Sequence, residues 1–314
     1  MKIGIIGIGF AGQLHSKVIE TLDLNITYYI YDVTSNAAQE FAKSHKCQAV
    51  NTLEELYEKI DAVIIATPTF THYNLVMEAI QKGKHILCEK PMSLQLSEAK
   101  EMLEMSRKNN KICAIGFNYR FFDITEILKN QNQIGEMCNI KILIKRLFRN
   151  DWHNKNNGVL ADLGIHLIDY ITYLCNQSIN LSTCKVRKKY IEDWDYDSKI
   201  LGKTEKGIPF ELTASRTKNP EEVQFNIEIV GTKSTFRYDS RKETTYVIEK
   251  DNISYKYNFE KEQKTEDFFD FTDSILRQDE AWLKAISSEN VKNIATFEDG
   301  FNAQKALEFF LSKK

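Results

Sequence analysis

Two residues of this sequence have the types and the spacing for proton transfer at one site. Asp162 and His166 stand four positions apart, so a helix places both side chains on one face. Imidazole exchanges a proton near neutral pH, and an alcohol that gives up a hydride must also lose its hydroxyl proton. We therefore predict that His166 is a general base and that Asp162 binds a substrate hydroxyl or holds the imidazole. A hydrogen-bonded pair on a helix surface has the same spacing.

Two further charged residues could contact a substrate. Asp169 lies about one turn beyond His166, where it is either a second orienting carboxylate or an acid on the helix surface. Arg120 follows Asn118 and Tyr119 at the point where the character of the sequence changes. Its guanidinium could bind a substrate carboxylate or phosphate, or it could join two domains by a salt bridge.

A glycine-rich turn near the start of the chain has the spacing of a phosphate-binding loop. Residues 7–12, Gly-Ile-Gly-Phe-Ala-Gly, follow an apolar run and open a helical pattern. Gly7 would permit a tight turn, Gly9 would let the backbone approach a pyrophosphate, and Gly12 would let the helix lie close to a sheet. The phosphates would lie at the helix N-terminus, beside the backbone of Phe10 and Ala11. Glycines also gather in ordinary turns, which is the competing interpretation.

Asp32 strengthens the nucleotide-binding interpretation. It follows the second apolar run, 20 residues after Gly12, where a carboxylate can accept hydrogen bonds from an adenosine ribose. The same carboxylate would repel a 2′-phosphate, and Val33 and Thr34 provide no arginine to bind one. We therefore expect NAD as the cofactor in preference to NADP.

Lys90 is a candidate for stabilising developing negative charge. Glu89-Lys90-Pro91 ends another apolar run, and in open α/β sheets ligands bind beyond the carboxyl ends of the strands. Glu89 and Lys90 would therefore lie near a nicotinamide, where an ammonium group can stabilise an alkoxide-like transition state. A surface lysine before a proline turn is the competing interpretation, and the residues alone favour it.

The elements that position these residues form two patterns along the chain. Up to about residue 118, short β-branched runs alternate with helical patterns, which predicts a parallel sheet covered by helices on both faces, the doubly wound Rossmann architecture. The predicted strands are residues 2–7, 26–31, 48–50, 62–67, 85–89 and 112–117. We predict a nucleotide-binding domain of residues 1–118.

The remaining residues, 119–314, are predicted to form an α+β domain for substrate binding and oligomerisation. Apolar and polar residues alternate at 136–145 and 223–230, the pattern of strands with one covered face. Further candidate strands are 210–217, 235–238, 245–249 and 253–257, and the spacing from 267 to 310 is helical. This predicts a large, mostly antiparallel sheet. Because an exposed sheet face is costly in water, we expect a homodimer or homotetramer that covers it.

Three further segments resemble one enzyme family. They are 66–72 (Ala-Thr-Pro-Thr-Phe-Thr-His), 83–91 (Gly-Lys-His-Ile-Leu-Cys-Glu-Lys-Pro) and 158–169 (Gly-Val-Leu-Ala-Asp-Leu-Gly-Ile-His-Leu-Ile-Asp). With 228–232 and 297–300, they make nearly the whole chain similar to the glucose-fructose oxidoreductase, inositol dehydrogenase and MocA (Gfo/Idh/MocA) family. Members of this family typically oxidise or reduce a secondary alcohol or ketone on a sugar, cyclitol or sugar-nucleotide with a nicotinamide cofactor.

The resemblance implies roles for individual residues. The family's Glu-Lys-Pro lysine falls on Lys90 and its Asp-x-x-x-His pair on Asp162 and His166, which favours the reactive interpretation of all three. Asn157-Gly158 stands where many members have Gly-Gly, a departure that affects the loop entering the helix but removes no reactive group.

Four more residues match positions of the family near the cofactor. Thr67, at a strand end before Pro68, is expected to contact the cofactor through its backbone or hydroxyl. His15 and His72 could line the cofactor, or they could be structural histidines held by hydrogen bonds.

Composition excludes several other classes of protein. With 42 Lys plus Arg against 44 Asp plus Glu, the net charge of -2 provides no strong field for nucleic acid or a membrane surface. No apolar run approaches the about 18 residues of a membrane helix, and the start of the sequence lacks a secretory signal, so we expect a cytoplasmic protein. The six cysteines show no C-x-x-C pair and no metal-ligand spacing, so we expect thiols and no metal site.

These observations predict an NAD-dependent oxidoreductase with a carbohydrate-like small-molecule substrate. A regulatory protein that keeps the fold and binds NAD without chemistry is the main alternative. The presence of Lys90, Asp162 and His166 together counts against it. Reduction of a non-carbohydrate such as a tetrapyrrole is a third possibility, because fold does not determine function.

Overall fold

The computed structural model describes residues 1–22, 26–129, 133–148, 158–242, 245–250, 253–258, 271–287, 291 and 293–313. Its contacts divide the chain into two units, residues 1–121 with 272–304 and residues 122–271 with 305–314. The predicted division into 1–118 and 119–314 differs from this at the C-terminal end. Residues 272–304 pack with the N-terminal unit instead of with the segment that precedes them.

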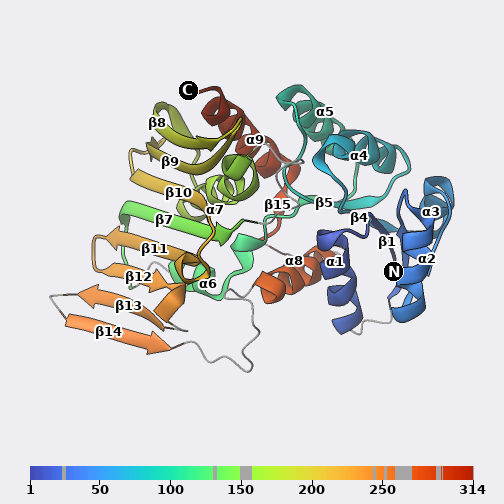
Figure 1. Cartoon of the computed structure of the whole chain (residues 1–314), viewed down its shortest axis with the longest axis horizontal. Helices are drawn as coiled ribbons and strands as arrows, with labels where there is room; N and C mark the ends of the chain where they lie inside the picture. Colours follow the sequence, from blue (N-terminus) through green and yellow to red (C-terminus); the bar gives the residue numbers. More distant parts are fainter. Residues whose placement is uncertain are drawn as a thin grey trace. The chain divides into compact units, whose positions relative to one another are not determined.

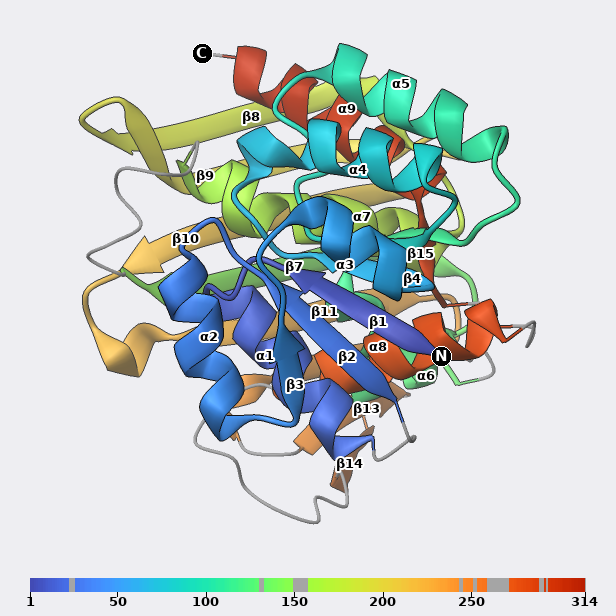
Figure 2. The same ribbon diagram turned by 90° about the vertical axis from the view of Figure 1, so that its right-hand side faces the viewer.

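The first unit contains the parallel sheet that its βα pattern predicts. Its strands lie in the order β3-β2-β1-β4-β5-β6, all parallel, and the short β15 (Ala295–Thr296) pairs antiparallel with β6. Figure 2 shows β1, β2 and β3 side by side. The strand order reverses between β1 and β4, the point where such sheets bind ligands. The strands are β1 (Lys2–Ile6), β2 (Thr27–Tyr31), β3 (Cys47–Ala49), β4 (Ala62–Ile65), β5 (His85–Cys88) and β6 (Cys113–Ile115).

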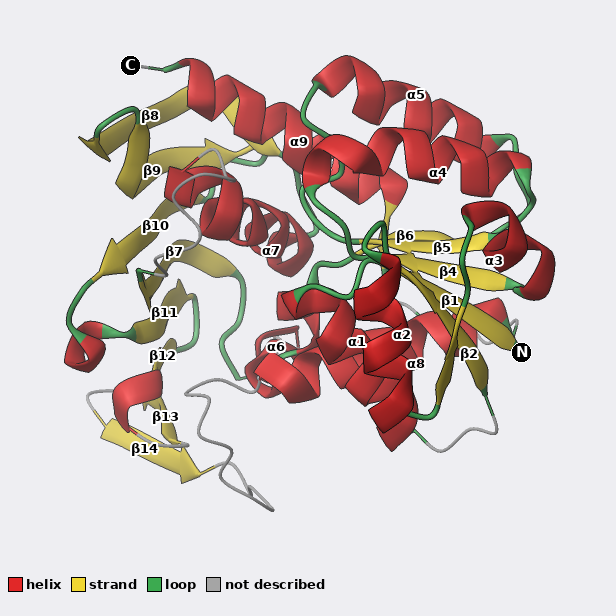
Figure 3. Cartoon of the chain, turned by 45° about the vertical axis from the view of Figure 1, so that its right-hand side comes forward, coloured by secondary structure: helices red, strands yellow, loops and turns green. Residues whose placement is uncertain are grey.

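Helices cover both faces of this sheet, which confirms the predicted Rossmann architecture. In Figure 3, α1 (Phe10–Thr21) and α8 (Phe271–Ile286) lie on one side, and α4 (His72–Gln81) and α5 (Leu96–Arg107) lie on the other. The apolar side chains between the layers are closely packed: Ile5, Ile64 and Trp282 are at most 1% exposed. The unit also contains α2 (Ser35–Ser44) and α3 (Leu53–Lys59), and α3 is capped by Thr52, whose hydroxyl accepts from the Glu55 N–H at 3.1 Å.

Eight strands form the sheet of the second unit, in the order β14-β13-β12-β11-β7-β10-β9-β8 (Figure 1). Among these described strands every neighbouring pair is antiparallel except β7 and β10, which confirms the mostly antiparallel sheet. The strands are β7 (Met137–Leu147), β8 (Ile179–Ile191), β9 (Trp194–Thr204), β10 (Pro209–Thr217), β11 (Gln224–Gly231), β12 (Thr235–Asp239), β13 (Thr245–Lys250) and β14 (Ile253–Asn258).

One face of the second sheet supports the helices of that unit. The alternation of β7 and β11 buries Ile142 and Ile227, which pair in register and are 1% exposed. The described α- and π-helices of this unit are α6 (Asp123–Lys129), the π-helix η3 (Leu160–Gly164), α7 (Ile165–Cys175) and the last residues of α9 (Phe297–Ser312). The helical spacing predicted from 267 to 310 therefore corresponds, within the described residues, to α8 and α9 with β15 between them.

The other face of the second sheet carries ion-paired side chains. Lys141 lies 2.9 Å from Glu228, which lies 2.9 Å from Arg237 on the next strand, and Arg237 also pairs with Glu249. Further along the sheet, Lys199 of β9 lies 2.7 Å from Glu211 of β10. We expected an exposed face that is costly in water, and that reason for oligomerisation is wrong for these strands, because charged side chains remain hydrated there.

Two further predictions concern the chain as a whole. None of the described helices is both long enough and apolar enough to cross a bilayer. All six cysteines have free thiols, and only Cys88 is buried.

Candidate active site

The glycine turn adopts the geometry that its sequence predicts. Gly7 has a φ of +87°, and a Cβ there would lie 2.8 Å from the Ala66 carbonyl oxygen. At Gly12 a Cβ would lie 1.9 Å from the Gly7 carbonyl oxygen, so the helix can approach the turn only without a side chain. By contrast, a Cβ at Gly9 would meet nothing within 4 Å. Gly7 and Gly12 are therefore required by the fold, while Gly9 faces open space at the point where the strand order reverses.

The start of α1 is suited to an anion. Gly9 is the N-cap of the helix, and no side chain caps it. The backbone N–H groups of a first helical turn point outward and carry a partial positive charge, which favours phosphate. Phe10 is 55% exposed and Ala11 is half-buried, so neither side chain closes this end of the helix. These features fit the pyrophosphate of a dinucleotide.

Asp32 connects the end of β2 to the glycine turn. One carboxylate oxygen accepts from the Ile8 N–H at 3.0 Å, and the other accepts from the Thr34 N–H at 2.9 Å. Each oxygen keeps a further lone pair, so the carboxylate can still accept hydrogen bonds from ribose hydroxyls. Val33, which follows it, is 90% exposed.

Thr67 and Pro68 follow the end of β4, next to the glycine turn. A Cβ at Gly7 would be 2.8 Å from Thr67 Cγ2, so the two segments are in close contact. The Thr71 hydroxyl donates to Thr67 Oγ1 at 2.7 Å. Thr67 thus lies beside the glycine turn at the carboxyl end of β4.

His72 is buried, and its ring lies between two backbone carbonyl groups. It is 0% exposed, with Nδ1 2.9 Å from the Pro91 carbonyl oxygen and Nε2 2.9 Å from the Thr67 carbonyl oxygen. Burial, the largest influence, lowers its pKa, so the ring is neutral and donates to one carbonyl at a time. Of the two alternatives for His72, the structural histidine held by hydrogen bonds fits these contacts, which connect it to Thr67 and to Pro91.

Glu89 and Lys90 follow β5, and a buried histidine holds the glutamate. His15 Nε2 lies 3.2 Å from Glu89 Oε1, and His15 Nδ1 lies 2.6 Å from Asp279 Oδ2. The second Glu89 oxygen accepts from the Lys90 N–H at 3.2 Å. The sequence contains no signal for the part played by Asp279, because it stands 264 residues from His15.

Asp162, His166 and Asp169 lie together in the second unit and are all buried, with exposures of 6%, 4% and 1%. The surface alternatives for the pair and for Asp169 are therefore wrong. Asp162 lies in the π-helix η3 and His166 in the first turn of α7. Short π-helical segments are frequent at functional sites.

Arg216 is the partner of Asp162. Its guanidinium forms an ion pair with Asp162 Oδ2 and also donates to the Leu147 carbonyl oxygen at 2.9 Å. Both side chains of the ion pair are largely buried, at 11% and 5% exposure. Arg216 lies in β10, 54 residues from Asp162, and was not predicted because nothing in the strand pattern distinguishes it.

A second residue that the sequence did not reveal fixes the start of this helix. Asp195 in β9 accepts from the Leu160 N–H at 3.0 Å and from the Ser198 hydroxyl at 2.5 Å. Burial, the largest influence, raises its pKa despite these hydrogen bonds. Gly158 has a φ of +84°, and a Cβ there would lie 1.8 Å from Asp195 Oδ1. Its neighbour Asn157 lies outside the described residues.

We expect Gly158→Ala to destabilise the protein by about 1–3 kcal/mol, because the new methyl group overlaps the carboxylate that caps the helix. Gly207→Ala is the matched control: Gly207 has a φ of +90°, but a Cβ there meets nothing within 4 Å. Urea unfolding of both variants separates the overlap from the strain of a positive φ. Equal losses in the two variants would show that contact with Asp195 does not matter.

Arg120 forms a buried ion pair. Its guanidinium is 4% exposed and forms a bidentate ion pair with Asp299, at 3.2 and 3.4 Å. Thr296 also donates to Asp299, from its N–H at 2.7 Å and its hydroxyl at 2.8 Å. Burial raises the pKa of Asp299, but the Arg120 charge and these hydrogen bonds lower it overall. Both residues belong to the first unit, so this ion pair does not join the two units, while the predicted substrate contact of Arg120 stays a prediction.

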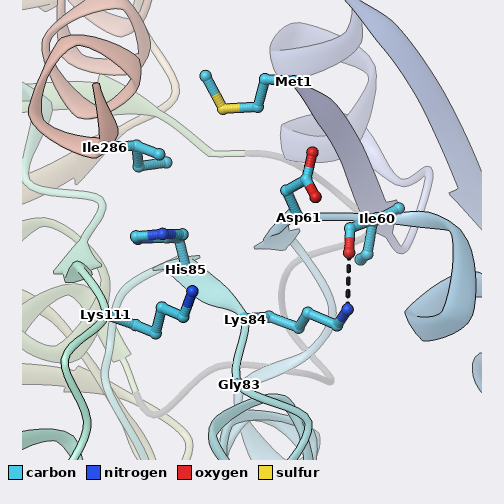
Figure 4. A pocket seen from close by; sticks show the side chains of 8 residues that line it. All are labelled: Met1, Ile60, Asp61, Gly83, Lys84, His85, Lys111 and Ile286. Carbon is cyan, nitrogen blue, oxygen red and sulfur yellow. Dashed lines mark hydrogen bonds between the residues drawn. The ribbon is translucent and has the colours of Figure 1, made fainter.

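A pocket of about 460 Å³ lies at the opposite end of the parallel sheet (Figure 4). Its lining includes residues that precede strands, such as Met1, Asp61 and Lys111, and Lys84 there donates to the Ile60 carbonyl oxygen at 2.7 Å. Sheets of this kind bind cofactors beyond the carboxyl ends of their strands, so this pocket is not the cofactor site. Within the described ranges no group of three His, Cys, Asp or Glu residues is arranged to hold a metal ion.

Comparisons with known proteins agree with this arrangement. Residues 1–117 match the model of the Gfo/Idh/MocA oxidoreductase family, NAD-binding Rossmann fold, and residues 129–313 match the model of its C-terminal alpha/beta domain. Glucose-6-phosphate 3-dehydrogenase of Bacillus subtilis (strain 168) is 29% identical over 340 aligned positions, which cover 99% of this chain and 96% of that protein. Myo-inositol 2-dehydrogenase of Thermotoga maritima is 26% identical, covering 98% and 96%.

Structural comparison extends the similarity to the whole fold. The solved structure of UDP-N-acetylglucosamine 3-dehydrogenase from Acidithiobacillus ferrooxidans matches with a TM-score of 0.85 at 21% identity, over 99% of both chains. Both domain models and these relatives span nearly the full length of the sequence. The chain therefore belongs to the Gfo/Idh/MocA family of oxidoreductases, with an NAD-binding Rossmann fold in its N-terminal part.

Proposed function

We propose that this chain transfers hydride between NAD and a ring carbon that carries a secondary alcohol or a ketone. The observation that carries the proposal is the Asp162 and His166 pair, buried within one helical turn of each other in a chain of this family. The similar proteins are named as dehydrogenases of glucose 6-phosphate, myo-inositol and UDP-N-acetylglucosamine. All three compounds carry secondary alcohols on a ring, so we propose a sugar, a cyclitol or a sugar-nucleotide as the substrate.

NAD is the proposed cofactor, and the residues of the first unit fit it. The open space at Gly9 and the uncapped start of α1 suit the pyrophosphate, and Asp32 suits the ribose hydroxyls. The Asp32 carboxylate beside an exposed Val33 favours NAD over NADP, because a 2′-phosphate would meet a negative charge and no arginine. When bound, the nicotinamide supplies hydride acceptance or donation.

The chain's own residues handle the proton and the developing charge. His166 takes the hydroxyl proton when the alcohol is oxidised and returns it in the reverse direction. Asp162, oriented by Arg216, accepts a hydrogen bond from a substrate hydroxyl or from the imidazole. Lys90 stabilises the negative charge that develops on the substrate oxygen. We propose these three as the catalytic residues.

The test is the formation of NADH or NADPH, followed by absorbance, with NAD and NADP in turn. The panel contains glucose, glucose 6-phosphate, myo-inositol and UDP-N-acetylglucosamine, and calorimetric titration of each cofactor runs beside it. Turnover with one compound class and NAD supports the proposal. Tight NAD binding without turnover across an extended panel of sugars, cyclitols and sugar-nucleotides would instead favour a protein that senses the nucleotide.

Self-association through the second sheet is part of the proposal. The outer face of β7, β11 and β12 presents both signs of charge, in Lys141, Glu228 and Arg237, which a second copy can pair with across a two-fold axis. Light scattering at low and moderate salt measures the association, and a monomer at working concentration under both conditions would refute it.

A further inference from the structure

His15 is enclosed between two carboxylates from distant parts of the chain. Its Nδ1 atom lies 2.6 Å from Asp279 Oδ2 in α8, and its Nε2 atom lies 3.2 Å from Glu89 Oε1 beyond β5. His15 is 0% exposed and Asp279 is 1% exposed, while the Glu89 side chain is 17% exposed. Both ring nitrogens can therefore donate to a carboxylate, and they do so at once only when the ring is doubly protonated.

The two carboxylates keep His15 charged. Burial, the largest influence, lowers its pKa, but the charge and hydrogen bond of Asp279, followed by those of Glu89, outweigh it and raise the pKa to about 10. At pH 7 the ring is therefore a buried imidazolium.

His15 in turn keeps Glu89 ionised and in place. Burial, the largest influence, raises the pKa of Glu89, but the hydrogen bond and charge of His15, followed by the charge of Lys90, lower it overall. The Lys90 N–H donates to the second carboxylate oxygen at 3.2 Å. Gly116 supports the carboxylate from another side, since a Cβ there would lie 3.0 Å from Oε1. The carboxylate is thus held by a cation, a backbone N–H and a close backbone contact.

The charge of Glu89 also acts on two other titratable groups of the described residues, His72 on α4 and Cys88 at the end of β5. Burial, the largest influence on each, lowers the pKa of His72 and raises that of Cys88 well above its ordinary value, so both are neutral near pH 7. His15 and Lys90 remain as the cations whose charges stabilise this carboxylate.

We propose that His15 is a positioning residue for hydride transfer: as a buried cation tied to Asp279, it fixes the Glu89 carboxylate beside Lys90 at the carboxyl end of β5. The inference rests on the function proposed above, which places the nicotinamide at this end of the sheet. His15 itself is shielded from solvent and acts through Glu89.

His15→Gln tests the charge and keeps a side-chain donor. Without the imidazolium, burial dominates at Glu89 and its pKa rises. A carboxyl group with a raised pKa becomes protonated at a higher pH, so turnover is lost earlier as the pH falls. We expect the kcat of His15→Gln, relative to that of the wild type, to fall as the pH is lowered, with the KM for NAD unchanged.

His85→Gln is the matched control. His85 is the first residue of β5, at the opposite end of the strand from Glu89. Its Nδ1 accepts from the Ile112 N–H at 3.0 Å, a contact that an amide oxygen can replace. The control variant should keep the wild-type pH profile. Turnover is measured with NAD and glucose 6-phosphate, myo-inositol or UDP-N-acetylglucosamine, whichever the wild type oxidises.

Nitrogen-15 NMR of histidine-labelled protein gives a readout that needs no substrate. The His15 signals are assigned by their absence from His15→Gln, and both ring nitrogens should stay protonated at pH 8 in the wild type. Asp279→Asn removes the stronger partner, so its His15 should titrate at a lower pH.

The outcomes separate this inference from the proposed function. If the wild type turns over and His15→Gln keeps the wild-type profile, or if His15 titrates near its ordinary pKa of about 6.5 in the wild type, the inference is wrong and the function stands. If the wild type oxidises no member of the panel, the proposed function fails and the hydride-transfer role of His15 fails with it. The inference is supported if the ratio of variant to wild-type kcat falls as the pH is lowered and the His15 ring of the wild type is doubly protonated at pH 8.

Discussion

We expect the His166→Ala variant to lose turnover by about 10²–10⁴-fold and to bind NAD as tightly as the wild type, because a positioned general base contributes this much to a rate. His166 is buried in α7 of the second unit, whereas the glycine turn and Asp32 belong to the first. None of the proposed cofactor contacts involves the His166 side chain, so the substitution removes none of them. NADH absorbance measures turnover, and calorimetric titration measures NAD binding.

Lys90→Ala provides the companion experiment, since Lys90 and His166 are proposed to act on the same substrate oxygen. It should also lose turnover and still bind NAD. His45→Ala serves as a control for removing a histidine elsewhere: the His45 ring stacks on Phe41 with centroids 3.7 Å apart. Wild-type turnover in both His166→Ala and Lys90→Ala would contradict the assignment of the catalytic residues.

The first unit was predictable because its signals are local. Three glycines within six residues specify one turn. In the structure, the backbone of that turn requires a glycine at two of these positions: Gly7 has a positive φ, and Gly12 packs closely against Gly7. The parallel strands could be identified because burial on both faces makes each a continuous apolar run, as in β4. Asp32 could be found from its spacing alone.

Two strands of the second sheet, β8 and β9, were not predicted from the sequence. β8 is the edge strand of the second sheet, and β9 lies next to it. β8 is polar along most of its length, with the sequence INLSTCKVRKKYI. An edge strand with exposed faces has little need for apolar alternation, so the period-two pattern that identified β7 and β11 is weak there.

The partners of the site residues could not be predicted, because they are distant in sequence and chemically ordinary. Arg216 and Asp195 act on the Asp162 helix from neighbouring strands, and Asp279 reaches His15 from α8. Asp299 illustrates a related limit. The segment that contains it was recognised as a family landmark, yet the sequence did not show that its carboxylate pairs with Arg120. Motifs identify positions, while packing decides what those positions touch.

Gly9→Ala and Gly12→Ala should separate cofactor binding from folding. We expect Gly9→Ala to fold with wild-type stability, because its Cβ meets nothing within 4 Å and its φ of −66° suits alanine. The methyl group nevertheless occupies the space where the backbone must approach the pyrophosphate. NAD affinity should fall by about 10- to 100-fold, the equivalent of about 1.4–2.8 kcal/mol.

We expect Gly12→Ala to have the opposite effect, with the stability of the fold reduced directly. Its Cβ would lie 1.9 Å from the Gly7 carbonyl oxygen, a backbone atom, so the turn and α1 must move apart at a cost of about 1–3 kcal/mol. Urea unfolding and NAD calorimetry on both variants make the comparison. If Gly9→Ala binds NAD as the wild type does, the pyrophosphate does not pass over Gly9. If Gly12→Ala is as stable as the wild type, the close packing of α1 on the turn is not what requires a glycine there.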